Sequence, residues 1–200
     1  MTPRVPDALV DDMAALKYPH WLAEHLDPTW RTRAHHRLIG REIAATVAAG
    51  GKLIVTTPPQ IGKSTICAEW APQWILSKSP ERSVIVASYG FRLAVRSVRR
   101  VRNRIRTFGA RFGVELAAGT TSADEWYTTK GGGAKAIGLN GGVTGFPCNG
   151  AMIIDDYCKS RADADSPVMR ENTWEWYSSG LISRMAPGTP QIVLATRWHP

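Results

Sequence analysis

The chain of 200 residues lacks the features that mark secreted and membrane proteins. Its three cysteines are odd in number and show no metal-site spacing, which predicts reduced thiols rather than disulfides or a zinc site. The best apolar stretch, residues 43–55, is too short to span a bilayer and is interrupted by Gly50, Gly51 and Lys52. The N-terminus contains acidic residues and no apolar signal-peptide core. We therefore expect a protein that is not secreted and has no membrane partner.

Acidic residues are also in short supply. Asp and Glu number 17 against 25 Lys and Arg, which gives a net charge of +8. This excess favours a polyanionic partner, nucleic acid first, although solubility alone accounts for part of it. With 44% hydrophobic and 21% charged residues, the chain has the composition of a globular protein. Its length suffices for one sizeable domain with a real core.

The stretch 52–66, KLIVTTPPQIGKSTI, predicts a short buried strand, a tight loop and the start of a helix. The two prolines of the loop fix φ and lack N–H donors, and Gly62 permits backbone conformations that other residues resist. This is the layout of a phosphate loop, in which backbone N–H groups at a helix N-terminus face an anion. Lys63 would reach the β- and γ-phosphates of ATP, and the Ser64 hydroxyl would ligate Mg²⁺.

The match to the phosphate-loop pattern G-x-x-x-x-G-K-[ST] is imperfect, because Thr57 stands at the position of the first glycine. A Gly-Lys-Ser turn at the start of an ordinary helix is the alternative interpretation. In the phosphate-loop interpretation the nucleotide-binding residues are Thr57, Pro58, Pro59, Gln60, Ile61, Gly62, Lys63, Ser64 and Thr65.

Further buried strands are predicted at residues 83–88, 151–154 and 191–195. Shorter strands at residues 113–118, 125–129 and 134–138 would form a small antiparallel excursion between two core strands. Helices are predicted at residues 7–16, 21–26, 32–49, 91–108 and 166–182, besides the one that follows the loop.

Strands that alternate with helices predict an α/β fold with a mostly parallel central sheet flanked by helices. With a phosphate loop after the first strand, the expected class is a P-loop NTPase of the ASCE type. We expect residues 1–30 to form an N-terminal arm and residues 31–200 to form the ATPase domain.

Two carboxylates, Asp155 and Asp156, follow the apolar strand 151–154. Carboxylates at the end of a buried strand are costly unless they hold a metal or a proton-transfer partner. The carboxyl ends of parallel strands would lie beside the phosphate loop, so Asp155 is a candidate Mg²⁺ ligand. Asp156 would take the place of the carboxylate that polarises the attacking water. A turn with two solvated aspartates is the alternative. The strand 191–195 likewise ends in a polar residue, Thr196, that would face the nucleotide.

The helix 91–108 carries the densest basic run of the chain, and every cation in it is arginine. A solvated helix face is the default interpretation of such a run. A surface that contacts phosphates is the other, because arginine binds phosphate better than lysine does. The sequence leaves both interpretations open.

Four motifs in order resemble the ATPase domain of the large terminase subunit of tailed bacteriophages. They are TPPQIGKS at 57–64, VIVASYGFRLA at 84–94, GLNGGVTGFPCNGAMIIDDYCKS at 138–160 and WEWYSSGLISRMAPGTPQIVLATRWHP at 174–200. The resemblance implies an ATP-hydrolysing motor of viral DNA packaging in the host cytoplasm. It implies ATP and Mg²⁺ as cofactors. It also implies double-stranded DNA, a ring of its own copies on the procapsid, the portal protein and the small terminase subunit as partners.

The resemblance also assigns roles to individual residues. Lys63 and Ser64 would bind phosphates and Mg²⁺, and Asp155 would coordinate the metal. Asp156 would hold the position of the catalytic carboxylate. Thr196 would belong to a coupling motif that senses the γ-phosphate and links hydrolysis to movement.

The chain departs from the family pattern in several places. Gln60 stands where an arginine is common, Asp156 replaces a glutamate, and Phe146 lies where some relatives carry an arginine. Arg184 and Arg197 are therefore the candidates for an arginine finger. The family's nuclease domain has no counterpart in this chain, so we expect no DNA cleavage. Two rival functions stay open: a helicase-like translocase, and a module that binds ATP and DNA without turnover.

Overall fold

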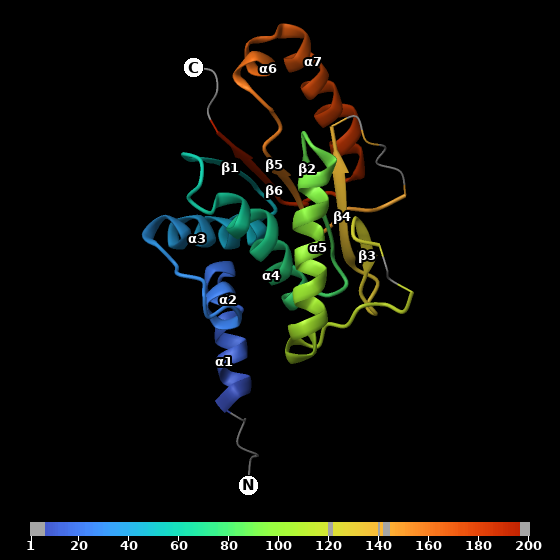
Figure 1. The fold of residues 1–200 in the computed structure, drawn as a ribbon. Coiled ribbons are helices and arrows are strands. Elements are labelled where there is room, and N and C mark those ends of the chain that lie inside the picture. The colour runs from blue at the N-terminus through green and yellow to red at the C-terminus, as the bar shows by residue number, and fades with distance from the viewer. Residues whose placement is uncertain (1–6, 120–121, 140, 142–144, 197–200) are drawn as a thin grey trace.

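The computed structural model describes residues 7–119, 122–139, 141 and 145–196 (Figure 1). Its centre is a six-stranded sheet with the order β1-β6-β5-β2-β4-β3, in which only β3 and β4 pair antiparallel. The strands are β1 (Lys52–Thr56), β2 (Ser83–Ser88), β3 (Glu125–Tyr127), β4 (Gly133–Gly138), β5 (Ala151–Asp155) and β6 (Gln191–Ala195). The predicted α/β fold with a mostly parallel sheet flanked by helices is confirmed.

Helices precede and follow most strands. They are α1 (Asp7–Ala15), α2 (Pro19–Leu26), α3 (Ala34–Ala49), η1 (Thr65–Trp70), α4 (Ala71–Lys78), α5 (Phe91–Phe108), η2 (Gly109–Phe112), α6 (Arg161–Asp165), α7 (Pro167–Glu175), η3 (Trp176–Leu181) and η4 (Ile182–Arg184). The helices expected at residues 7–16, 21–26, 32–49, 91–108 and 166–182 are confirmed to within a few residues at their ends. No helix within the described residues is long and apolar enough to cross a membrane.

The alternation of side chains along the strands divides the core into two layers. On one face, Val84, Val86 and Ile153 pack with α3, η1, α4 and α5 in the larger cluster. On the other face, Ile85 and Met152 pack with residues of η3 in a smaller cluster. All six residues of β2 are buried because helices cover both of its faces.

The first strand differs from its prediction as a buried element. Only Val55 of β1 is buried, and Ile54 is 72% exposed. The reason is the position of β1 at the edge of the sheet, where it pairs with β6 alone. An apolar run of this length does not distinguish an edge strand from a central one.

The predicted antiparallel excursion is also wrong in part. Residues 113–118 form no strand, and Leu116 makes only an isolated bridge to Thr128. β4 belongs to the central sheet, where it pairs parallel with β2, and only the short β3 runs antiparallel to it. Its small residues allow α5 to approach closely, since a Cβ at Gly138 would lie 2.9 Å from the Cβ of Phe91.

The N-terminal helices pack against the helix that follows the loop. Leu22, Ala23 and Leu26 of α2 are buried in the larger cluster. His20 is 1% exposed, and burial lowers its pKa to about 4, so its imidazole is neutral. The close approach of its Nδ1 to Gly40 places His20 in the core between α2 and α3, a packing role rather than a ligand-binding one.

The helix after the loop begins with a π-helical turn, η1, and carries a buried acid. Glu69 of η1 is 2% exposed. Its carboxylate accepts hydrogen bonds from Arg100 at 2.6 Å and from Arg104 at 3.2 Å, both on α5. The Arg104 guanidinium also lies 3.9 Å from the ring centroid of Trp70. This contact, the Glu69 fork, joins η1 to α5.

Glu69→Gln removes the charge that both arginines contact. We expect the free energy of unfolding to fall by about 3 kcal/mol, because loss of one partner leaves the half-buried Arg104 uncompensated. Urea unfolding followed by tryptophan fluorescence measures the change. Glu42→Gln, at an exposed position of α3, is the matched control and should change stability by less than about 0.5 kcal/mol. Equal effects of the two substitutions would contradict a structural role for the fork.

Candidate functional site

The carboxyl ends of three neighbouring parallel strands form one edge of the sheet. β1 and β6 pair with Thr56 opposite Ala195, and β5 and β6 pair with Asp155 opposite Leu194. The segments that leave these strands therefore start side by side, although they are far apart in the sequence. This register brings the predicted loop, the two aspartates and Thr196 together.

Lys63 is the centre of this arrangement. Its side chain is buried, and Nζ donates a hydrogen bond of 2.5 Å to Oγ1 of Thr196, a residue 133 positions later. Nζ also lies 3.7 Å from Oδ1 of Asp156. A buried ammonium group is costly without such partners. The predicted proximity of these three side chains is therefore present in the structure.

Ser64 and Asp155 form a second contact beside the first. The Ser64 hydroxyl donates a hydrogen bond of 3.0 Å to Oδ1 of Asp155. Burial raises the pKa of Asp155 to about 6, and the neighbouring charge of Asp156 acts in the same direction, while the Ser64 hydrogen bond opposes both. A hydroxyl and a carboxylate that share a hydrogen bond can both turn toward one hard cation.

Two residues of the site have unusual backbone conformations. Gln60 has φ 62° and Asp156 has φ 49°, and they are the two non-glycine residues with positive φ within the described ranges. Such conformations cost about 1 kcal/mol or more and cluster at functional sites. Gly62, with φ 84°, provides the third positive φ of the site without that cost.

Two histidines that sequence reasoning did not assign to the loop contact its backbone. The Nε2 atoms of His35 and His36 lie 3.0 Å and 2.8 Å from the carbonyl oxygen of Ile61, to which they donate. His36 Nδ1 accepts from the backbone N–H of Arg33, so His36 also closes the N-terminus of α3. Burial lowers the pKa of His36, which favours the neutral ring that can make both bonds. Their position, just after the start of the helix that leads into β1, was the only sequence signal.

The remaining predicted nucleotide-binding residues are less buried than Lys63. Pro58, Pro59 and Gln60 are exposed, whereas Thr57, Ile61 and Thr65 are half-buried. Pro58, Pro59 and Gln60 therefore form the exposed part of the turn, just before Ile61, whose carbonyl contacts the two histidines, and the buried Lys63.

The candidate arginines do not join this group. Phe146 is buried against β4 and the ring of Tyr127, away from solvent. Arg184 lies in η4, where its backbone carbonyl accepts from the Cys148 N–H. Arg197 lies outside the described residues. Within the ranges that the structure describes, no arginine donates to Asp155, Asp156 or Thr196.

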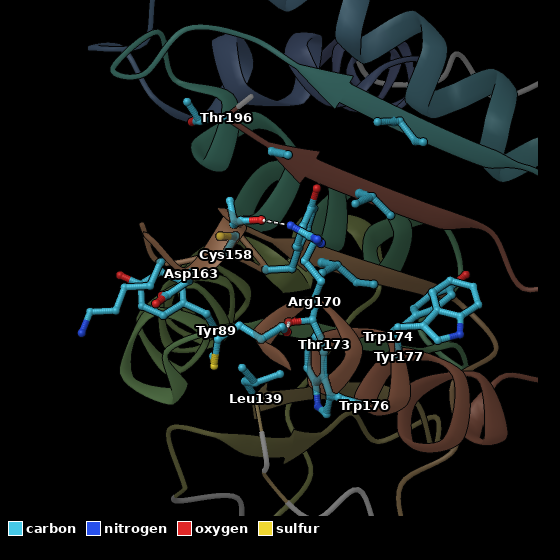
Figure 2. A pocket seen from close by; sticks show the side chains of 18 of the residues that line it. Tyr89, Leu139, Cys158, Asp163, Arg170, Thr173, Trp174, Trp176, Tyr177 and Thr196 are labelled. Carbon is cyan, nitrogen blue, oxygen red and sulfur yellow. Dashed lines mark hydrogen bonds between the residues drawn. The ribbon is translucent and has the colours of Figure 1, made fainter. Parts of the chain in front are cut away.

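A cavity of about 790 Å³ opens beside Thr196 (Figure 2). Ile54, Val193 and Ala195 form its floor on the sheet, and aromatic side chains of α7 and η3, among them Trp174 and Trp176, form a wall. Lys63, Ser64 and the two aspartates do not line it. The sequence analysis did not predict this cavity, because an exposed Ile54 on an edge strand leaves no sequence signal.

Thr196→Val removes the hydroxyl that accepts the hydrogen bond of Lys63, and so tests this contact. We expect the nucleotide-free chain to lose about 2 kcal/mol of unfolding free energy, because the buried Lys63 ammonium loses its hydroxyl acceptor. Urea unfolding measures the loss. Thr57→Val is the matched control, because the Thr57 hydroxyl reaches only the neighbouring Pro58 carbonyl, at 3.4 Å. A loss no larger than that of the control would mean that the Lys63–Thr196 hydrogen bond contributes nothing.

Comparison with known proteins identifies a family for the chain. A search of curated proteins gives no match. The model of the family described as "terminase large subunit, T4likevirus-type, N-terminal" matches residues 54–200, a range that begins in β1 and includes Lys63, both aspartates and Thr196. Membership supports a role in phage DNA packaging. The chain belongs to the family of T4-like terminase large subunit N-terminal domains.

Proposed function

We propose that the chain is the ATP-hydrolysing part of a motor that packages double-stranded DNA into a viral capsid. The observation that carries this proposal is the convergence of five polar side chains at one edge of the sheet, where its strands run parallel: Lys63, Ser64, Asp155, Asp156 and Thr196. P-loop NTPases hold phosphates with a lysine and a helix N-terminus, and the position of Lys63 just before η1 supports that role.

The loop would hold the phosphates of ATP with its backbone N–H groups and with Lys63. The Lys63 ammonium contacts Thr196 and Asp156. When phosphate oxygens replace these acceptors, the Thr196 hydroxyl becomes free to bond elsewhere. Thr196 directly follows β6, so its hydrogen bond is a means by which the strand can respond to a bound phosphate.

Ser64 and Asp155 fit an Mg²⁺ ion. Mg²⁺ takes oxygen ligands, commonly one or two carboxylates together with phosphate oxygens and waters. The described residues contain no group of three His, Cys, Asp or Glu side chains that could hold a metal ion by themselves. When bound, Mg²⁺ would neutralise charge on the phosphate oxygens.

Asp156 would orient the attacking water and accept its proton. Its carboxylate lies at the same strand end as Asp155, and its positive φ turns the chain sharply at this point. The reaction is then phosphoryl transfer from ATP to water, promoted mainly by positioning and by electrostatic stabilisation.

The proposed partners come from family membership and charge. Double-stranded DNA fits the net charge of +8. A ring of copies of this chain on the procapsid, the portal protein and the small terminase subunit complete the proposed assembly in the host cytoplasm.

Steady-state ATPase measurements with Mg²⁺, with and without duplex DNA, test the proposal. Lys63→Ala should lower kcat by at least about a hundredfold. The substitution removes the lysine ammonium, whose positive charge is already in position to stabilise the transferred phosphoryl group. Asp156→Asn should lower kcat by about 10²–10⁴-fold, because the amide cannot accept the proton of water. Lys52→Ala, the same substitution at the exposed start of β1, is the matched control and should leave kcat unchanged.

Turnover that survives Lys63→Ala would overturn the phosphate-loop assignment. Two other results would favour the rival functions. Strand separation of a DNA duplex during turnover would indicate a helicase-like translocase. ATP binding that requires Lys63 but gives no hydrolysis would indicate a binding module without turnover.

A further inference from the structure

The seven arginines of α5 fall into two groups. Arg100 and Arg104 make the Glu69 fork, and the buried Arg102 donates to the carbonyl oxygen of Ser122. The other four side chains are exposed. They are Arg92, Arg96, Arg99 and Arg106, which we call the arginine stripe.

The members of the stripe share one face of the helix. Their spacings of four, three and seven residues return to the same side of an α-helix. The opposite side, with Ala94, Val98, Val101 and Ile105, is buried against the sheet. Figure 1 shows α5 in front of the sheet, with no drawn element across its outer side. From Arg92 to Arg106 the stripe is about 21 Å long.

The four arginines of the stripe carry positive charge without ion-pair partners among the described residues. The helix contains no Asp or Glu. Burial lowers the pKa of Arg102, and the charges of Arg106 and Arg99 lower it further, so the cations of this helix repel one another. An external polyanion would relieve that repulsion.

We propose that the arginine stripe contacts the phosphate backbone of duplex DNA. This inference rests on the proposed function, which makes DNA the partner. A straight row of about 21 Å covers roughly six base pairs of B-DNA along the helix axis. Arginine offers a planar fork of donors that matches phosphate oxygens, and every cation of the stripe is arginine. Contacts to phosphates carry no sequence preference, as a translocating protein requires.

The stripe lies close to the candidate nucleotide site. α5 follows β2 at the carboxyl edge of the sheet, and the charge of Arg96 acts on Asp155. The Glu69 fork ties α5 to η1, the helix that begins directly after the loop. DNA bound along the stripe would therefore lie on a helix that packs against the loop's own helix.

Fluorescence anisotropy with a labelled duplex of about 30 base pairs, without nucleotide, tests the proposal over about 50–200 mM KCl. The test variant is the double substitution Arg99→Gln and Arg106→Gln, which leaves the fork and Arg96 in place. Loss of two phosphate contacts should lower the affinity at least about tenfold and should reduce the slope of log K against log salt by about 2. The matched control is Arg37→Gln and Arg41→Gln on α3, an equal loss of exposed charge, which should bind like the wild type.

Thermal unfolding of both variants checks that each is folded. An unchanged affinity and salt slope in the stripe variant, or equal losses in both variants, would overturn the proposal. Polyglutamate that competes with the duplex at equal charge concentration would overturn it in favour of an acidic protein partner. DNA-free ATPase activity of the wild type and of Lys63→Ala is measured in parallel. Absence of this ATPase activity in the wild type would count against the proposed function. The anisotropy measurements alone test whether the stripe binds DNA.

Discussion

The buried Lys63 ammonium is the constraint on which the site depends. Lys63 is only 6% exposed, so its ammonium group needs acceptors, and these come from the two segments that follow β5 and β6. The order β1-β6-β5 brings these acceptors close to Lys63, because it places the ends of the three strands side by side. The same strand order leaves β1 at the edge of the sheet. The exposure of Ile54 and the cavity beside Thr196 therefore follow from the strand order that brings the site residues together.

The fold was predictable where one local pattern decides an element. The β-branched runs of β2, β5 and β6 and the apolar periodicity of α5 identify these elements directly. The local sequence pattern did not reveal that β1 is largely unburied or that β4 belongs to the central sheet. Both depend on which strands become neighbours, and that choice is made by packing between distant segments. The alanines and glycines of β4 carry a weak strand signal but fit beneath α5.

The site shows the same division. The convergence of Lys63, Ser64, Asp155, Asp156 and Thr196 was predictable. The phosphate-loop pattern places the first two after β1, the other three follow β5 and β6, and the carboxyl ends of parallel strands meet at one edge of a sheet. The contacts of His35 and His36 with the Ile61 carbonyl were not, because a backbone acceptor has no residue type to reveal it. These histidines hold the turn between two residues of positive φ, Gln60 and Gly62, and so take part in fixing a conformation that the sequence of the loop alone does not specify.

Two separate contacts connect the loop and its helix to other elements, and a ligand at the loop would affect only one of them. Lys63 meets β6 through one hydrogen bond to Thr196, a contact that phosphate oxygens can replace. η1 meets α5 through the Glu69 fork and the packing of Arg104 on Trp70, which no ligand at the loop would displace. In the proposed function, phosphate bound at the loop would therefore break the link to β6 and leave the link to α5 in place. The helix that keeps its link to the loop is the one that carries the arginine stripe.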